Sequence, residues 1–158
     1  MLKRIQFLLM LVSLATVSVA LGDDPGDSYS GGSSEREEQG QTRELLNIAR
    51  SSIEGMKYKR AIREAYAVIR IDGRNSDAWN LIGYSNRKLG KYKKAAKAYR
   101  KALKYDPTHK GALEYQGELF ISLGQYEKAL DNRNRLAQLC PDGCEQLTDL
   151  ELALSAVN

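Results

Sequence analysis

The chain has 158 residues, enough for one domain, and 42% of them are hydrophobic while 28% are charged, as is usual in globular proteins. It contains one histidine and two cysteines, which argues against histidine-based catalysis and against a metal site. The formal net charge is +4, but the charges are unevenly distributed along the chain.

Residues 1–22 have the pattern of a secretory signal. Lys3 and Arg4 precede a long apolar run, and the small residues Ala20 and Gly22 mark two suitable cleavage sites. The run is slightly shorter than the roughly 20 residues that span a bilayer, so a cleaved signal is favoured over an uncleaved anchor or a buried helix. We therefore expect an exported protein, located in the periplasm or, as an alternative, secreted.

Residues 23–41 are dominated by glycine, serine and acidic residues, and their net charge is −5. Such a segment buries too little apolar surface to offset the entropy lost on ordering. It is predicted to be a flexible acidic linker, with an acidic arm that contacts the basic domain or a partner as the alternative. The remaining residues, 42–158, carry a net charge of +7.

From residue 42 onward the sequence repeats with a period of 34 residues, which is the strongest kind of fold signal. In each copy, apolar and small residues recur at helical spacing in two stretches, so that each copy predicts two amphipathic helices. In the middle copy Gly90 suits the turn between them, and Pro107 ends the second helix. The predicted units are repeats at 42–75, 76–109 and 110–143, followed by a leucine-rich closing helix at 144–158.

Two cysteines lie between the last repeat and the closing helix. Cys140 and Cys144 flank a turn-forming Pro-Asp-Gly run. Export would place them in an oxidising compartment, so a structural disulfide that clamps the closing helix onto the stack is favoured. Free thiols, a metal site and a redox pair are the alternatives, although a thioredoxin-like pair has two intervening residues in a different fold.

The repeats resemble those of the tetratricopeptide repeat family. The middle copy carries most of its pattern, at Trp79, Ile82, Gly83, Ala95, Tyr99, Ala102 and Pro107. The third copy departs from it at Leu113, Arg133 and Leu136, and the degenerate first copy has Gly55 and Met56 at the turn. The resemblance implies an all-α fold: a superhelix of three helix-turn-helix repeats with a carboxy-terminal capping helix. The carboxy-terminal part is also similar to the ends of short exported bacterial proteins of this class.

The resemblance implies a concave groove, lined by the first helix of each repeat, that binds a peptide or a helix of a partner protein. Relatives that clamp a carboxyl terminus use Lys, Asn and Arg, whereas Leu46, Leu81, Gly111 and Tyr115 occupy those places here, so that mode is not expected. Some groove residues could instead pack between neighbouring helices. The predicted groove, basic at its start and middle and acidic at its end, comprises Arg43, Leu46, Arg50, Asp77, Asn80, Tyr84, Arg87, Lys88, Glu114 and Glu118.

A run of cations marks the second helix of the middle repeat. No acidic residue lies between Asp77 and Asp106. A solvated convex face is the favoured interpretation, contact with an anionic membrane or an acidic protein is the alternative, and nucleic acid is a poor partner for an exported protein. This predicted basic face consists of Lys93, Lys94, Lys97, Arg100, Lys101 and Lys104.

The single histidine, His109, follows Pro107 in a predicted turn, and we expect it to be exposed and without a catalytic role. The sequence contains no catalytic constellation and no phosphate-binding glycine loop. It therefore predicts a non-enzymatic adaptor in the periplasm that needs no metal or cofactor and binds a protein or peptide partner. The alternatives are association through the basic face and, as an enzyme, thiol–disulfide exchange through Cys140 and Cys144. The oligomeric state is not predicted.

Overall fold

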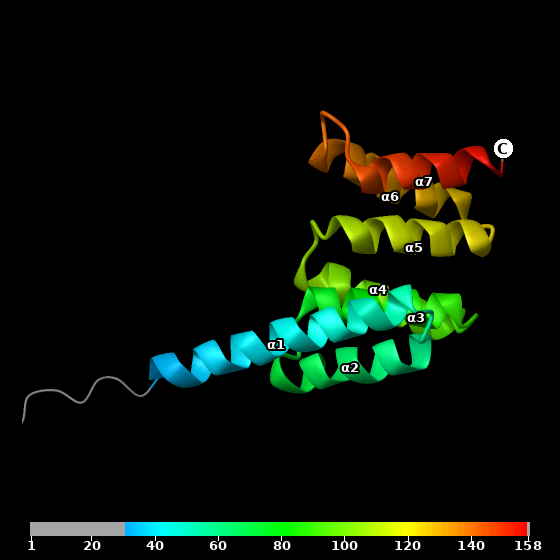
Figure 1. Ribbon diagram of the computed structural model, residues 1–158. Coiled ribbons are helices and arrows are strands. Elements are labelled where there is room, and N and C mark those ends of the chain that lie inside the picture. Colours follow the sequence, from blue (N-terminus) through cyan, green and yellow to red (C-terminus); the bar gives the residue numbers. More distant parts are fainter. Residues whose placement is uncertain (1–30, 158) are drawn as a thin grey trace, which may run out of the picture.

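A computed structural model describes residues 31–157 of the chain, and this part is entirely helical (Figure 1). Its helices form antiparallel pairs α1–α2, α3–α4 and α5–α6, which stack in order, and α7 covers the last pair by packing on α5 and α6. The predicted all-α superhelix of three helix pairs with a closing helix is confirmed. The elements are α1 (Gly31–Glu54), α2 (Tyr58–Ile71), α3 (Ser76–Lys88), α4 (Tyr92–Tyr105), α5 (Lys110–Ser122), α6 (Tyr126–Leu139) and α7 (Glu145–Ser155).

The predicted signal at residues 1–22 lies outside the described residues, as does the predicted linker up to residue 30. Within residues 31–157, no helix combines the length and the apolar character needed to cross a bilayer.

The linker prediction is wrong for residues 31–41, because α1 begins at Gly31 and extends beyond the stack (Figure 1). The side chains that begin α3 and α5, Asn75 and His109, accept hydrogen bonds from the backbone N–H groups of Ala78 and Ala112. The equivalent position one period earlier is Gln41, which continues the helix. Without a capping residue or a proline at this boundary, nothing in the sequence stops the helix from extending towards the amino terminus.

The turns inside the three pairs share one backbone conformation. Gly90 and Gly124 have positive φ angles of 71° and 68°, and Met56 occupies the equivalent place in the first pair with a φ of 57°. Glycine adopts this region without a steric penalty, whereas a side chain with a Cβ does not. The first turn is therefore strained relative to the other two.

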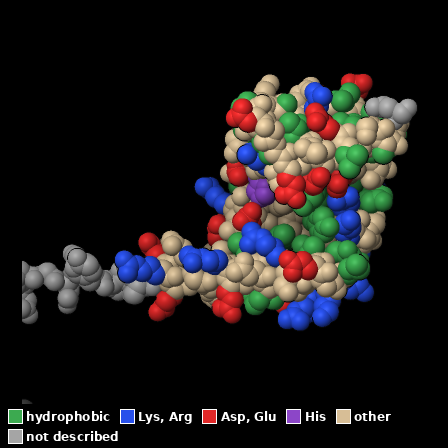
Figure 2. Space-filling view, turned by 45° about the horizontal axis from the view of Figure 1, so that its top comes forward, with side chains coloured by type: hydrophobic (Ala, Val, Ile, Leu, Met, Phe, Trp, Pro, Cys, Tyr) green, Lys and Arg blue, Asp and Glu red, His purple; other side chains and the backbone are tan. Residues whose placement is uncertain are grey.

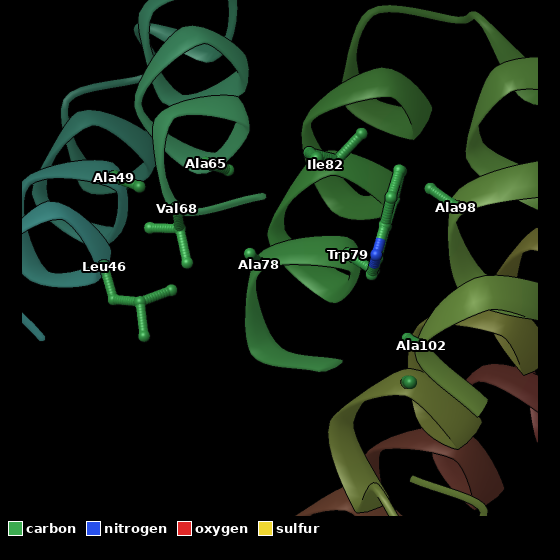
Figure 3. Packing of buried hydrophobic residues seen from close by; sticks show 10 residues of the cluster. Leu46, Ala49, Ala65, Val68, Ala78, Trp79, Ile82, Ala98 and Ala102 are labelled. Atoms are coloured by element: carbon green, nitrogen blue, oxygen red, sulfur yellow. The ribbon is translucent and has the colours of Figure 1, made fainter. Parts of the chain in front are cut away.

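Small residues set the spacing between the helices of the middle pair. A Cβ on Gly83 would lie 2.5 Å from the ring of Tyr99, which is fully buried. Figure 3 shows Trp79 and Ile82 of α3 facing Ala98 of α4 in the same core. The small residues of the family pattern therefore allow α3 and α4 to pack closely.

The closing helix explains why the third repeat departs from the pattern. A Cβ on Gly117 would lie 2.7 Å from Leu150 of α7, so that α7 fills the space that Tyr99 fills beside Gly83. Arg133 on α6 replaces the equivalent aromatic residue. Its Nε lies 3.0 Å from Oε1 of Glu151 on α7. The closing helix was predicted to extend to residue 158, but α7 ends at Ser155, and Val157 beyond it is exposed.

Candidate functional site

The first helices of the three repeats, α1, α3 and α5, line one side of the stack, and α3 contacts both of the others. A cavity of about 300 Å³ opens between them. Its walls come from all three helices, which matches the predicted position of the groove. The lining residues are Arg50, Ile53, Glu54, Asn80, Leu81, Tyr84 and Tyr115.

Three tyrosines form a row along this surface. The ring centroids of Tyr84 and Tyr115 lie 4.8 Å apart, and Tyr58 at the start of α2 lies 6.5 Å from Tyr84. The guanidinium carbon of Arg87 lies 5.5 Å from the Tyr84 centroid and 5.8 Å from that of Tyr115. Lys88 places its Nζ 5.3 Å from the Tyr84 centroid. The groove therefore has an aromatic surface that is edged by cations.

The charges of the groove are largely paired across neighbouring helices. Arg50 Nη2 lies 3.0 Å from Oδ2 of Asp77, and Arg87 Nη2 pairs with Oε2 of Glu118. Because each pair joins consecutive repeats, it fixes the relative position of their first helices. The predicted division into a basic start and an acidic end is thus replaced by two local, nearly neutral pairs.

His109 was expected to be an exposed turn residue, and the structure corrects this. Its Nδ1 accepts the N–H of Ala112 at 3.2 Å, so in the neutral ring Nε2 carries the proton and donates to Oδ1 of Asp77 at 3.1 Å. This hydrogen bond, together with the nearby Arg50 guanidinium, lowers the pKa of Asp77 although burial opposes the shift. His109 therefore has a structural role that links α3 to α5.

Two of the predicted groove residues lie in the interior. Leu46 is 7% exposed and packs in the core of the first pair (Figure 3). Glu114 is 5% exposed. Burial raises the pKa of Glu114 to about 8, assisted by the negative charges of Glu118 and of Asp149 and Glu145 at α7. Sequence reasoning placed Glu114 on the groove because it did not account for the covering by α7.

Asn80 is also buried, at 7% exposure, but it lines the groove cavity. Its Oδ1 has no hydrogen-bond partner within residues 34–157. A buried amide oxygen without a partner is uncommon in folded proteins and costs free energy. Beside it, burial raises the pKa of Tyr115 to about 12, so that this phenol keeps its proton. The lining of the cavity therefore combines two polar side chains, Asn80 and Tyr115, with aromatic surface.

The remaining predicted groove residues are at least partly accessible, and most of them contact one another. Arg43 is the outlying member, because it lines a larger cavity of about 520 Å³ between α1 and the start of α3. Tyr58 was not among the predicted groove residues. Tyr58 begins α2, the second helix of its repeat, and the family pattern assigns the groove to the first helices. The accessible members are Arg43, Arg50, Asp77, Tyr84, Arg87, Lys88 and Glu118.

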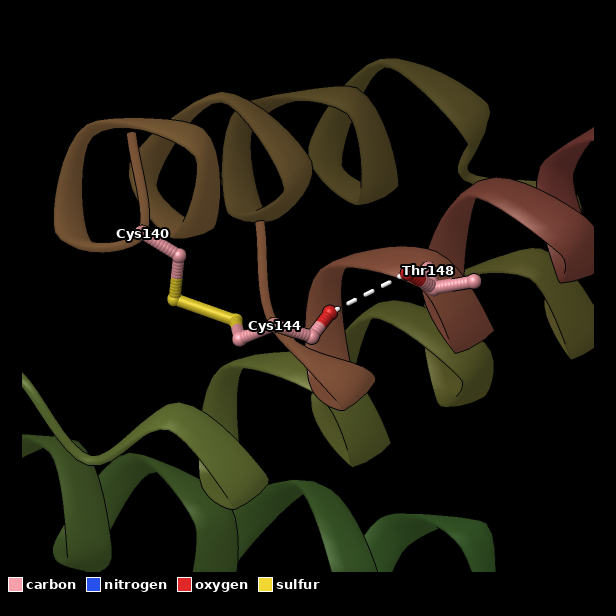
Figure 4. The surroundings of a disulfide bond; sticks show 3 residues. All are labelled: Cys140, Cys144 and Thr148. Carbon is pink, nitrogen blue, oxygen red and sulfur yellow. Dashed lines mark hydrogen bonds between the residues drawn. A yellow bond between two sulfur atoms is a disulfide. The ribbon is translucent and has the colours of Figure 1, made fainter. Parts of the chain in front are cut away.

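The structure brings the two cysteines together at the junction of α6 and α7 (Figure 4). Their sulfur atoms are at bonding distance, and their Cα atoms lie 5.8 Å apart, inside the range of protein disulfides. Gly143 between them has a positive φ of 90°. The hydroxyl of Thr148 donates to the carbonyl oxygen of Cys144 at 3.2 Å, at the first turn of α7.

The predicted basic face lies on α4, and five of its six cations are exposed. Lys101 is the exception, because it is partly buried with its Nζ 3.7 Å from the ring centroid of Trp79. By contrast, Figure 2 shows basic and acidic side chains interspersed along the part of α1 that extends beyond the stack. Within the described residues, no group of three or more His, Cys, Asp or Glu side chains is arranged to hold a metal ion.

Comparison with known families supports the repeat interpretation. Tetratricopeptide repeat models match residues 76–109 and 98–131. The chain is 29% identical over 117 residues to tetratricopeptide repeat protein 37 of Xenopus laevis, a match covering 67% of this chain and 8% of that protein. It is 28% identical over 116 residues to human superkiller complex protein 3, covering 66% and 7% respectively. The chain thus spans less than a tenth of these curated relatives.

Solved structures share the fold at low sequence identity. The translocator chaperone SycD of Yersinia enterocolitica type III secretion has a TM-score of 0.67 at 18% identity, covering 74% of this chain and 91% of that one. The second tetratricopeptide repeat domain of human RPAP3, solved with the HSP70 peptide SGPTIEEVD, has a TM-score of 0.65 at 23% identity, covering 76% and 97%.

Proposed function

Because the chain carries tetratricopeptide repeats, we propose that it is a non-enzymatic scaffold that binds a peptide segment of a partner protein in its concave groove. The similarity to the RPAP3 domain, which was solved with a bound peptide, supports this proposal. The observation that carries it is the groove cavity, whose walls combine the side chain of Asn80 with the rings of Tyr84 and Tyr115.

The groove suits an extended segment with one apolar side chain. The Asn80 side chain, which lines the cavity, would hydrogen-bond to the peptide backbone. An aromatic, proline or aliphatic side chain would pack on Tyr84 and Tyr115. Because the groove charges are already paired with one another, charged groups of the peptide would contribute register more than affinity. A bare carboxyl terminus lacks its family clamp here, as Leu81 and Gly111 occupy two of the clamp places.

Affinity capture from the envelope of the source cells would identify the partner, and calorimetry with its peptide would test the groove. We expect Tyr84→Ala and Asn80→Ala each to weaken binding by about tenfold, typical of a contact worth about 1.4 kcal/mol. The exposed variant Arg100→Ala on α4 serves as the control. Unchanged affinity in both groove variants, with helical circular dichroism preserved, would reject the groove as the binding site.

We also propose that the protein is exported to the periplasm and that Cys140 and Cys144 form a structural disulfide there. The signal pattern and the juxtaposed cysteines support this proposal. Alkylation of the purified exported protein should find no free thiol, and cell fractionation should recover a processed chain in the periplasm. Reactive thiols that exchange with glutathione would instead support the alternative, a thiol–disulfide exchange protein.

The second candidate function is association through the basic face. The observation that favours it is that no ion pair within residues 34–157 involves a side chain of α4.

A further inference from the structure

A second cavity, of about 390 Å³, opens between α2 and α4. None of its lining residues lines the groove cavity between α1, α3 and α5. Its floor is apolar, formed by Trp79, Ile82 and Ala98, and its rim carries Lys94, Lys97 and Lys101. The groove cavity differs in that its lining includes an acidic side chain, Glu54, beside Arg50.

The floor is held rigidly. Trp79 is 7% exposed, and its Nε1 donates to the carbonyl oxygen of Gly73 at 3.0 Å, which fixes the orientation of the indole. Tyr66 on α2 meets the indole edge-on, with ring centroids 6.1 Å apart and an interplanar angle of 86°. The cavity is therefore preformed, and a ligand would not have to order its floor.

The rim cations converge because of their spacing. Lys94, Lys97 and Lys101 are three and four residues apart, which places them along one side of α4. The ammonium group of Lys101 is already drawn over the indole ring, 3.7 Å from its centroid. No acidic side chain of α4 is available to offset these charges, and no ion pair within residues 34–157 involves them. The three lysines line one cavity, so their positive charges reinforce one another there and would attract an anion.

We propose that this cavity binds an acidic peptide segment of a partner protein, with the carboxylates on the lysine rim and an aromatic or aliphatic side chain on the floor. Charge complementarity selects the acidic segment. The recessed floor suits a single inserted side chain better than a bilayer. Binding to a membrane surface requires apolar groups that protrude from the protein, whereas Trp79 is almost fully covered. The site is independent of the concave groove, so either can fail without the other.

The single tryptophan of the chain lies in this cavity and reports on binding directly. The probe is the synthetic peptide Asp-Glu-Asp-Phe-Asp-Glu-Asp, which contains no tryptophan. We expect it to change the fluorescence of Trp79 in the full-length processed protein, with an affinity that falls steeply as salt is raised. Replacing its phenylalanine by alanine should weaken binding about fivefold, because the floor then loses its apolar contact.

Two charge-matched double variants locate the site. Lys94→Ala with Lys97→Ala should weaken binding by about tenfold, whereas Lys93→Ala with Arg100→Ala, on the same helix but outside the cavity, should change it less than twofold. All four positions are exposed, so the fold should be preserved, as circular dichroism would verify. Equal losses in the two variants would overturn the proposal in favour of diffuse attraction.

Two further arms complete the test. Vesicles containing phosphatidylglycerol should bind no more tightly than the peptide and should not depend on Lys94 and Lys97; tighter, cavity-dependent binding to vesicles would overturn the peptide assignment. Tyr84→Ala, which alters the groove, should leave peptide binding unchanged. A loss in that variant would show that the acidic peptide occupies the groove and not this cavity.

Discussion

Glu114→Gln should stabilise the protein, and increasingly so as the pH rises above 4.5. Glu114 is buried between α5 and α7, and burial raises its pKa from 4.5 to about 8. Between these two values the unfolded chain releases a proton that the folded chain retains, so the free energy of unfolding decreases as the pH rises. Below pH 4.5 Glu114 is protonated in both the folded and the unfolded state, so its burial costs no charge-related free energy. Above about pH 8 the folded state carries the buried charge, and the loss of stability is complete.

The magnitude follows from the size of the shift. Each pKa unit corresponds to about 1.4 kcal/mol, so the shift sets an upper limit of several kcal/mol. Small movements of α7 would admit water to the carboxylate, and we expect about 2 kcal/mol in practice. Glutamine has the shape of the protonated side chain and carries no charge. The variant should therefore exceed the wild type only slightly in stability near pH 5 and by the full amount near pH 9.

Urea denaturation followed by circular dichroism, at pH 5 and pH 9, measures this difference. Glu127→Gln, an exposed substitution on α6, controls for the general loss of one negative charge. A stability difference between Glu114→Gln and the wild type that is the same at both pH values would refute the reasoning, as would an equal pH dependence in the Glu127 control.

Three other changes test the packing, each by thermal unfolding. Met56→Gly should stabilise by about 0.5–1 kcal/mol, because it relieves the positive φ of 57° in the first turn at the cost of some backbone entropy. Gly83→Ala should destabilise by about 1–3 kcal/mol, since its Cβ meets the Tyr99 ring at 2.5 Å, whereas Gly40→Ala on the exposed part of α1 should stabilise slightly. Asp77→Asn should cost about 1 kcal/mol at neutral pH, because it weakens the contacts of Asp77 with Arg50 and His109. Because folding lowers the pKa of Asp77 from 3.8, that difference should diminish as the pH falls below 3.8.

The sequence was sufficient for the architecture because repeat packing depends on small residues at fixed spacing. Gly83 and Ala102 belong to the repeat pattern on which the predicted helix pairs were based, and both are buried. The start of α1 was not predictable in this way, since composition favoured a linker and only the missing cap at Gln41 argued for a continued helix. Composition describes an average tendency, whereas a helix end depends on one or two specific residues.

The groove was predicted less completely, because the family pattern gives the direction of a side chain but not what covers it. Glu114 points to the expected side, yet α7 lies over it, and α7 is not part of the repeat pattern. His109 was considered in isolation, and its contact with Asp77 joins residues 32 positions apart. Such contacts depend on how far each repeat rotates relative to the next, which a residue pattern does not specify.

Helix α3 is the element on which both proposed sites depend. Successive residues on a helix are separated by about 100°, so Trp79 and Asn80 face different cavities although they are neighbours in the sequence. Gly83 lies close to Tyr99 of α4 and keeps the two helices in contact, while Tyr84 and Arg87 extend to α5. A ligand bound in either cavity would therefore contact α3, which also lines the other cavity. Gly83→Ala should therefore weaken peptide binding in the cavity between α2 and α4 more than binding in the groove, because it displaces α4 and its lysine rim from α3.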